Sequence, residues 1–439
     1  MSLRISLCEA SSSQGQFVLA RLLGRAERVL DRTVESGAIR LVRQVRRGGD
    51  AALLEAVRRL DGAGAVPEGA TRADGLRLVV ASADEEARSL PAKLLSALDE
   101  AIDAVTAFYR PQLPEPVFRL ERSGLVLEEV RTPLARVGLY VPGGRAVYPS
   151  TVIMSAVPAR LAGVTEIVVA TPPAAFRQAA ALRYVLARLE VDEIWGMGGA
   201  HAVAALAYGT ETIRRVDKIC GPGNAWVTAA KRFVAGDVGI DSLAGPTEVL
   251  ILADAGANPA WVAADLLAQA EHDPHAAAVL LTSSRELGEA VLVELERQLP
   301  SLATAATARE ALEGSGAILL VAGAEEALEL AEAIAPEHLQ LVGPEVEALA
   351  PRVRSAGAVF VGASSAEVFG DYLAGPSHVL PTCGSARFTS ALGVEDFQRR
   401  SHRIRVEPAA AARLAEATAL LAEAEGLPAH RAAALARLP

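Results

Sequence analysis

An acid and a base stand next to each other in the segment AIAPEHLQLV, where Glu337 and His338 directly precede an apolar run typical of a strand. Adjacent side chains point in different directions, so each one could serve a separate proton transfer. A loop glutamate beside a capped histidine would have the same sequence. The segment therefore predicts a candidate acid–base pair and leaves the purely structural interpretation open.

A second group of side chains suits a metal ion. In DLLAQAEH, Gln269 and His272 lie three residues apart, which places both on one face of a helix. His272 and His275 form an HxxH spacing, but Pro274 between them should end the helix and makes this pair the weaker candidate.

Further candidate ligands lie far along the chain. The glycine-rich segment GDYLAGPSHVLPT contains Asp371 and His378, and the C-terminal segment contains Glu425 and His430. A glutamine, an aspartate and two histidines would offer two oxygen and two nitrogen ligands, a set that suits Zn²⁺ or another first-row divalent ion. The sequence alone does not bring these regions together.

Glycine turns form a third pattern. The segments VGLYVPGG, EIWGMGGA and VDKICGPGN each join an apolar stretch to an expected helix. Such turns can hold a phosphate, because the first N–H groups of a helix point outward and its dipole favours negative charge. Neither GMGGAH nor GPGNAW completes the G-x-G-x-x-G/A fingerprint, since the sixth residue is His201 or Trp226. The turns are weak evidence for a dinucleotide site, and close packing alone also explains them.

The elements that must position these groups follow from the apolar pattern. Between Val137 and Val249, continuous apolar strands alternate with helices, which is typical of a parallel sheet covered on both faces. The later strands EVLILAD, AAAVLLTSS, AILLVAG, HLQLVG and AVFVGA predict a second sheet of this kind. Helices are also expected from a capping Asp50 and from Pro91, with the strand LRLVV between them.

We therefore predict an α/β fold with two Rossmann-like parallel-sheet domains, a small N-terminal arm and a helical C-terminal tail. The expected arm is 1–35, the first domain 36–136 with 250–381, the second domain 137–249 and the tail 382–439. The first domain would carry the metal and catalytic residues, and the second would be the dinucleotide side. The tail has too little apolar core to fold alone, so we expect it to pack on a partner such as a second copy.

Composition limits the class of protein. Of 439 residues, 51% are hydrophobic and 22% are charged, a core-forming globular composition. The 43 basic and 53 acidic residues give a net charge of −10, which disfavours nucleic acid and anionic membranes as partners. Neither a signal peptide nor a membrane span is expected from the apolar pattern. Cys8, Cys220 and Cys383 form no CxxC pair, which favours the cytoplasm.

Several of these segments together carry a family resemblance. AGPTEVLILAD, DLLAQAEHDP, APEHLQL and GDYLAGPSHVLPT, with GLYVPGG and VDKICGPGNAWV before them, closely resemble histidinol dehydrogenase, and the likeness covers residues 50–430. The resemblance implies an NAD-dependent alcohol and aldehyde dehydrogenase of the cytoplasm. It also implies an intertwined homodimer with one zinc ion per subunit.

The resemblance assigns roles to residues of this sequence. The implied catalytic pair is Glu337 and His338, and the implied zinc ligands are Gln269, His272, Asp371 and, from the other subunit, His430. The implied substrate contacts are Thr247, Gln269, His272, His338, Asp371, His378, Glu425 and His430, the last two donated by the other subunit. The implied cofactor contacts are Tyr140, His201 and Asn224. The family commonly has glutamine where this chain has His201, whose imidazole has a shorter reach.

The implied reaction oxidises L-histidinol to L-histidinal and then to L-histidine while two NAD⁺ are reduced. His338 would accept the alcohol proton, Glu337 would activate the water that adds to the aldehyde, and zinc would hold the imidazole and amine of the substrate. A related zinc and NAD dehydrogenase of another alcohol, such as a sulfonated propanediol, is the nearest alternative. A non-catalytic zinc-dependent assembly protein is another, and a metallohydrolase is disfavoured because no HExxH-type base is present.

Overall fold

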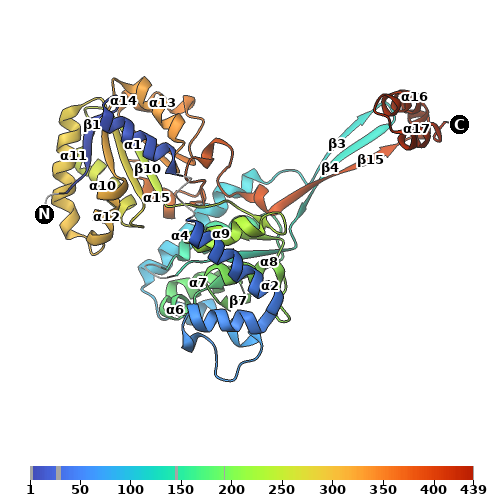
Figure 1. Cartoon of the computed structure of the whole chain (residues 1–439), viewed down its shortest axis with the longest axis horizontal. Helices are drawn as coiled ribbons and strands as arrows, with labels where there is room; N and C mark the ends of the chain where they lie inside the picture. Colours follow the sequence, from blue (N-terminus) through green and yellow to red (C-terminus); the bar gives the residue numbers. More distant parts are fainter. Residues whose placement is uncertain (1–2, 26–30, 144–146, 192, 439) are drawn as a thin grey trace.

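The computed structural model describes residues 3–25, 31–143, 147–191 and 193–438. Two six-stranded sheets form its centre (Figure 1). Sheet A is parallel throughout and has the order β1 (Ser6–Glu9), β12 (Ala317–Leu320), β11 (Ala277–Thr282), β10 (Glu248–Ala253), β13 (His338–Val342) and β14 (Ala358–Val361). Sheet B has the order β2 (Arg77–Leu78), β7 (Glu193–Gly196), β6 (Glu166–Thr171), β5 (Arg136–Tyr140), β8 (Lys218–Cys220) and β9 (Gly239–Ile240). Only β2 runs antiparallel to its neighbour in sheet B. The predicted α/β fold with two parallel sheets is confirmed.

Helices cover both faces of sheet A because its strands are apolar on both sides. Leu250 and Leu252 of β10 point to one face, which is covered by α1 (Ser13–Leu23) and α13 (Ala324–Ile334). Val249 and Ile251 point to the other face, which is covered by α10 (Pro259–Ala270), α11 (Arg285–Gln298) and α12 (Ala305–Ser315). This alternation is the period of two that a strand imposes. Two short helices follow the last strands, α14 (Pro344–Glu347) and α15 (Glu367–Tyr372).

Sheet B is covered in the same way. One face carries α2 (Arg32–Leu60), α8 (Gly199–Tyr208) and α9 (Ala225–Val234). The other face carries α4 (Ala92–Tyr109), α5 (Pro149–Leu161) and α7 (Ala180–Arg188). The short helices α3 (Ala83–Ala87) and α6 (Pro173–Gln178) lie beside α7.

The division of the chain differs from the expected one at the N-terminal side. α2 and α4 pack on sheet B, so residues 36–136 do not join the first domain as we expected. The described part of residues 1–35 is no separate arm, because β1 pairs with β12 and α1 covers sheet A. The helical pattern shows that a helix has an apolar face but not which sheet that face will cover.

Two local details also differ from expectation. α2 starts well before Asp50 and bends at Gly49, whose φ of 53° is left-handed. Asp31, not Asp50, caps α2, and the Asp50 N–H donates to the side chain of Glu211 at 2.7 Å. The Asp50 carboxylate instead accepts from the backbone of Ala73, which is a tertiary contact that the capping pattern could not predict.

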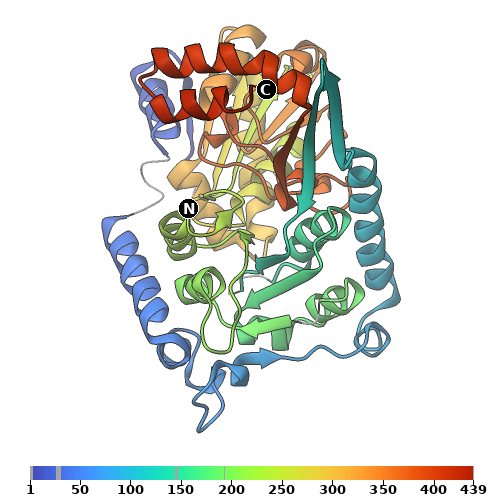
Figure 2. The same ribbon diagram turned by 90° about the vertical axis from the view of Figure 1, so that its right-hand side faces the viewer.

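A long antiparallel arm projects from the body (Figures 1 and 2). It consists of β15 (Gln398–Val406), β4 (Leu125–Pro133) and β3 (Val117–Arg122), and it carries α16 (Pro408–Ala424) and α17 (Pro428–Leu435) at its far end. The expected tail therefore includes an unpredicted strand, and its first residues up to Phe397 pack into the core beside sheet B. No helix among the described residues is long and apolar enough to span a bilayer.

Candidate active site at the amino edge of sheet A

The candidate acid–base pair lies where two neighbouring parallel strands begin. β13 starts at His338, and Glu337 directly precedes it, so the predicted place before a strand is confirmed. On the adjacent strand, β10 starts at Glu248, and Thr247 directly precedes it. The pairing of β10 with β13 therefore brings a second set of polar groups beside the pair.

Glu337 is buried among hydrogen-bond donors. Its Oε2 accepts from the Thr247 hydroxyl at 2.6 Å and from the Glu248 N–H at 3.0 Å. Burial raises the pKa of Glu337 well above its ordinary value, although these donors oppose the shift. A carboxyl group with a raised pKa holds a proton more strongly than an ordinary carboxyl group, which suits a group that transfers protons.

His338 is oriented by the neighbouring strand. Its Nδ1 lies 3.1 Å from the backbone oxygen of Glu248. Because a carbonyl can only accept, Nδ1 must carry the hydrogen, which leaves Nε2 as the basic nitrogen. Burial lowers the pKa of His338 to about 4, against the opposing effect of Asp371. The imidazole is therefore held in its neutral, proton-accepting form.

Gln269 and His272 reach the same edge from the end of α10. The Nε2 of Gln269 donates to the Thr247 hydroxyl at 2.8 Å, but its fully buried Oε1 has no partner among the described residues. α10 ends at Ala270, so His272 lies just beyond the helix and not on it as predicted. The Nδ1 of His272 donates to the Ala268 backbone at 2.9 Å, which leaves Nε2 to bind a ligand. An unpartnered amide oxygen and a correctly oriented imidazole fit a divalent metal ion.

Asp371 and His378 approach from α15 and the loop that follows it. The Nδ1 of His378 donates to the Asp371 backbone oxygen at 3.0 Å and lies 3.9 Å from its carboxylate. Burial lowers the pKa of His378, Asp371 opposes that shift, and His272 adds to it. These mutual effects, with those on His338, show that the predicted groups share one region.

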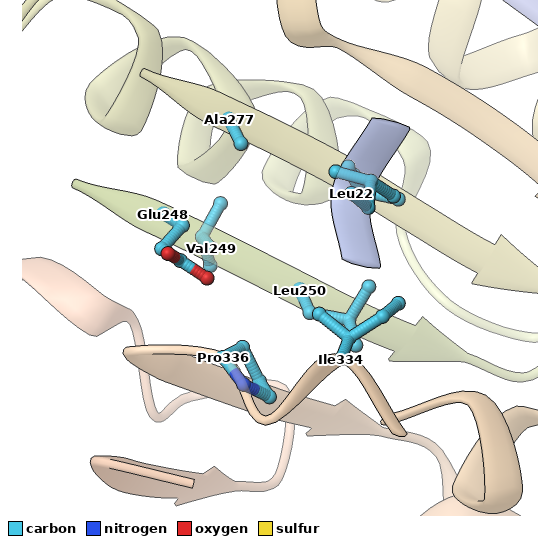
Figure 3. Close-up of a pocket in the computed structure, with 8 residues that line it drawn as sticks. Leu22, Glu248, Val249, Leu250, Ala277, Ile334 and Pro336 are labelled. Carbon is cyan, nitrogen blue, oxygen red and sulfur yellow. The ribbon is translucent and has the colours of Figure 1, made fainter. Parts of the chain in front are cut away.

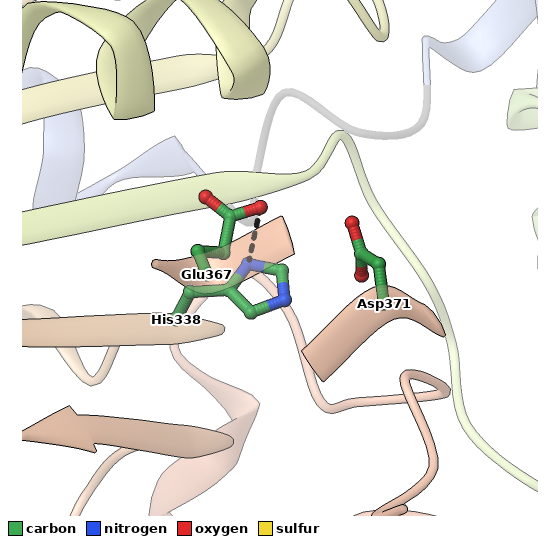
Figure 4. A group of neighbouring side chains, drawn as sticks. All are labelled: His338, Glu367 and Asp371. Carbon is green, nitrogen blue, oxygen red and sulfur yellow. Dashed lines mark ion pairs between the residues drawn. The ribbon is translucent and has the colours of Figure 1, made fainter. Parts of the chain in front are cut away.

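Glu367 also lies in this region, although the sequence did not predict it as a site residue. Ligand atoms of His338, Glu367 and Asp371 lie within 4.8 Å of one another, and Figure 4 shows the Glu367 carboxylate beside the imidazole of His338. Glu367 is 1% exposed, and neither of its oxygens has a hydrogen-bond partner among the described residues. Burial raises its pKa well above the ordinary value, and Asp371 and Glu337 raise it further. The available signal was its position four residues before Asp371, which places both on one helix face.

The two tail residues are far from this site within a single chain. Glu425 ends α16 and His430 lies on α17, and both are exposed at the far end of the arm (Figure 1). The body thus brings Gln269, His272 and Asp371 into one region, although the ligand atoms that converge there within 4.8 Å are those of His338, Glu367 and Asp371, and the fourth predicted ligand lies elsewhere.

The predicted cofactor residues gather at the carboxyl edge of sheet B. Tyr140 ends β5, and Asn224 caps α9 in the turn after β8. The strand order of sheet B reverses between β5 and β8, because the chain adds β6 and β7 on one side of β5 and β8 and β9 on the other. Ligands of open α/β sheets bind at such a topological switch point. The Asn224 oxygen already accepts from the first N–H groups of α9, so its amide nitrogen is the group left for a ligand.

His201 is buried in a polar contact that the sequence did not predict. Its Nε2 lies 2.8 Å from the Asp61 carboxylate, which also accepts from the Gly198 N–H. The Gly199 N–H donates to the hydroxyl of Tyr140 at 3.0 Å. These contacts occupy the glycine turn before α8, so it does not present a phosphate cradle. In the turn VGLYVPGG, residue 144 lies outside the described residues.

Comparisons with known proteins show which family this chain is similar to. A family model described as histidinol dehydrogenase matches residues 25–438. A histidinol dehydrogenase of Synechococcus sp. is 46% identical over 94% of this chain and 95% of its own length. One from Nitrosomonas europaea is 44% identical over 93% of each. The crystal structure of histidinol dehydrogenase from Elizabethkingia anophelis has a TM-score of 0.87 and 30% identity, covering 100% of this chain and 98% of that chain.

Proposed function

The chain belongs to the histidinol dehydrogenase family, and from this premise we propose that it oxidises L-histidinol through L-histidinal to L-histidine at a zinc site, reducing two NAD⁺ in succession. As a member of that family it is an NAD-dependent oxidoreductase of histidine biosynthesis. The observation that carries the proposal is the unpartnered, buried Oε1 of Gln269 beside the Glu337–His338 pair.

Gln269, His272 and Asp371, with His430 of the partner subunit, would hold the zinc ion. When bound, the ion supplies a fixed positive charge that anchors the imidazole and amine of the substrate. The buried Oε1 of Gln269 and the Nε2 of His272 support this assignment because each is oriented by a hydrogen bond through its other polar atom.

His338 serves as the general base in both oxidations. Its Nε2 accepts the hydroxyl proton of histidinol while the carbon loses a hydride to the nicotinamide, so the alcohol gives up two electrons. In the second oxidation it accepts a proton from the aldehyde hydrate while a second hydride leaves. The hydrogen bond from Nδ1 to the Glu248 carbonyl keeps Nε2 directed at the substrate.

Glu337 removes a proton from the water that adds to the aldehyde between the two hydride transfers. Its raised pKa makes it a stronger base than an ordinary carboxylate once it is ionised. The hydroxyl of Thr247 donates to Glu337 and accepts from Gln269, so it links the base to a proposed zinc ligand. Thr247 and His378 would also contact the substrate.

NAD⁺ would bind at the carboxyl edge of sheet B with Tyr140 and Asn224 as contacts, whereas His201, whose Nε2 is engaged by Asp61, would support the turn instead of touching the cofactor. The connection from β9 to β10, residues 241–247, joins this edge directly to the amino edge of sheet A. A nicotinamide bound there would face the Glu337–His338 pair across the junction of the two sheets.

The active form would be a homodimer in the cytoplasm. Glu425 and His430 would complete the site of the other subunit, which explains why they are exposed at the end of a projecting arm. All three cysteines are free, as expected in a reducing compartment.

The test is to incubate the purified protein with histidinol, NAD⁺ and Zn²⁺ and to count the NADH formed per histidine. We expect two NADH per histidine and no NADH with a sulfonated propanediol. Oxidation of the sulfonate alone, or zinc binding without NADH formation, would contradict the proposal.

A further inference from the structure

The backbone of Glu248 contacts both members of the acid–base pair. Its N–H donates to Glu337 Oε2 at 3.0 Å, and its carbonyl accepts from His338 Nδ1 at 3.1 Å. Any displacement of this one residue therefore moves the base for water and the base for the alcohol together.

The side chain of Glu248 is anchored by a guanidinium from the N-terminal segment. Arg25 donates from Nε to Oε1 at 2.9 Å and from Nη2 to Oε2, forming a forked pair. The backbone N–H of Cys383 donates to the same carboxylate at 2.5 Å. The two side chains are 13% and 5% exposed, so the pair is largely shielded from water.

Arg25 also holds the turn that leads to the catalytic pair. Its Nη2 donates to the backbone oxygen of Ile334 at 2.8 Å, and its Nη1 donates to that of Leu22. Ala335, which follows Ile334, has a left-handed φ of 49°. This backbone conformation is energetically unfavourable for a residue with a Cβ atom. Such a conformation persists only when its surroundings enforce it, and Arg25 supplies one of these contacts.

The space beside this pair is too small to be a ligand site. Figure 3 shows Glu248 at the amino end of β10 near Pro336, with Leu22 of α1 farther along the strand near Ile334. The cavity there holds about 10 Å³ and is lined mainly by apolar side chains such as Leu22, Leu250 and Ile334, which leaves room for no more than one water. The charged pair must therefore act through the protein rather than on a bound molecule.

We propose that Arg25 and Glu248 are positioning residues for the Glu337–His338 pair. The inference rests on the proposed function but adds the side chains of Arg25 and Glu248, to which that function assigns no role. Arginine is required because its fork reaches the carboxylate and two backbone carbonyls at once, which a lysine cannot do. The chain's first segment thereby sets the catalytic geometry.

The experiment compares Arg25→Gln, Arg25→Lys and Glu248→Gln with the wild type in the zinc-loaded dimer. Arg285→Gln is the matched control, because Arg285 forms an exposed ion pair with Glu9 of β1 in the same sheet. Each variant is assayed for kcat and KM with histidinol and with histidinal, for bound zinc and for its melting temperature.

We expect kcat in both half reactions to fall by about 10- to 100-fold in Arg25→Gln and Glu248→Gln. A displacement of a catalytic group by up to about one ångström has an effect of this size. KM for histidinol should stay within about twofold because the metal ligands are untouched. Arg25→Lys should retain more kcat than Arg25→Gln, and Arg285→Gln should match the wild type.

A wild-type kcat in folded Arg25→Gln and Glu248→Gln would overturn the proposal, and so would a loss that only follows the fraction of protein unfolded. If Arg25→Gln does not fold, kcat of folded Glu248→Gln decides the test, since that variant removes the other half of the ion pair. A wild-type protein that forms no NADH from histidinol would instead defeat the proposed function, so the two failures are distinguishable.

Discussion

Single hydrogen bonds decide which atoms of this site can do chemistry. The carbonyl of Glu248 fixes the hydrogen of His338 on Nδ1, and two donors fix Oε2 of Glu337. The acid and the base are thus adjacent in sequence but oriented by another strand. The types and spacing of these residues were predictable, whereas their tautomer, their raised or lowered pKa values and the buried Glu367 depend on contacts distant in sequence.

Replacing Glu337 with glutamine tests the division of labour between the two residues. Because glutamine cannot accept the proton of water, histidinal oxidation should fall by about 100-fold or more, while histidinol oxidation falls much less. Separate assays with the alcohol and with the aldehyde measure the two steps. Equal loss of both half reactions would contradict the assignment.

The lowered pKa of His338 predicts a loss of stability in acid. The unfolded chain binds a proton near the ordinary pKa of 6.5, whereas the folded chain resists it down to about 4. Stability is therefore present above pH 6.5 and is lost as pH falls from 6.5 toward 4. At pH 5 this group should cost about 2 kcal/mol of the free energy of unfolding.

Urea unfolding of the chelator-treated protein at pH 7.5 and pH 5.0 checks this expectation. The wild type should lose about 2 kcal/mol more than His338→Gln between the two values. The same loss in both proteins would show that His338 is not held neutral by the fold.

At the scale of elements, apolar runs were the most reliable guide. The strands β10 and β11 are buried at every position, which is why their sequences predicted a parallel sheet. The arm strands β3 and β15 are exposed along most of their length, so they carry no such signal. The place of α2 and α4 on sheet B and the end of α10 before His272 are set by tertiary packing, which periodicity does not report.

Substitution of Gly221, which directly follows β8, tests the close approach of the β8 end to the end of β5 at the cofactor edge. Its φ is 113°, and a Cβ there would stand 2.1 Å from the backbone oxygen of Tyr140. Gly236 is the matched control, since its φ of 100° carries similar strain but its Cβ would meet nothing within 4 Å. Gly221→Ala should therefore destabilise the protein by about 1–3 kcal/mol more than Gly236→Ala.

Denaturant unfolding measures this difference, and KM for NAD⁺ should rise in Gly221→Ala only. Equal stability and equal KM in the two alanine variants would mean that the approach of β8 to β5 does not shape the cofactor edge.

At the scale of the whole molecule, the two helices of the arm bury little apolar surface, because their buried side chains among the described residues are four alanines of α16. α17 has no buried residue, and large apolar side chains stand exposed on the arm: Phe118, Leu120, Ile404, Leu420 and Leu421. Exposed apolar surface on a projecting element indicates a protein interface. The helical character of the tail was predictable from its sequence, and its packing on a partner stays a prediction, but the β-arm that carries it away from the body was not predictable.

Mixed dimers test most directly the claim that one active site is built from two chains. His338→Ala removes the base but leaves the tail, whereas His430→Ala removes the donated ligand but leaves the base. Each variant alone should be inactive. After equal amounts are dissociated and reassembled together, half of the dimers are mixed and one of their two sites is intact, so about one quarter of wild-type histidinol-dependent NADH formation should return. No recovery in verified mixed dimers, or full activity of His430→Ala alone, would contradict a site completed by the partner subunit.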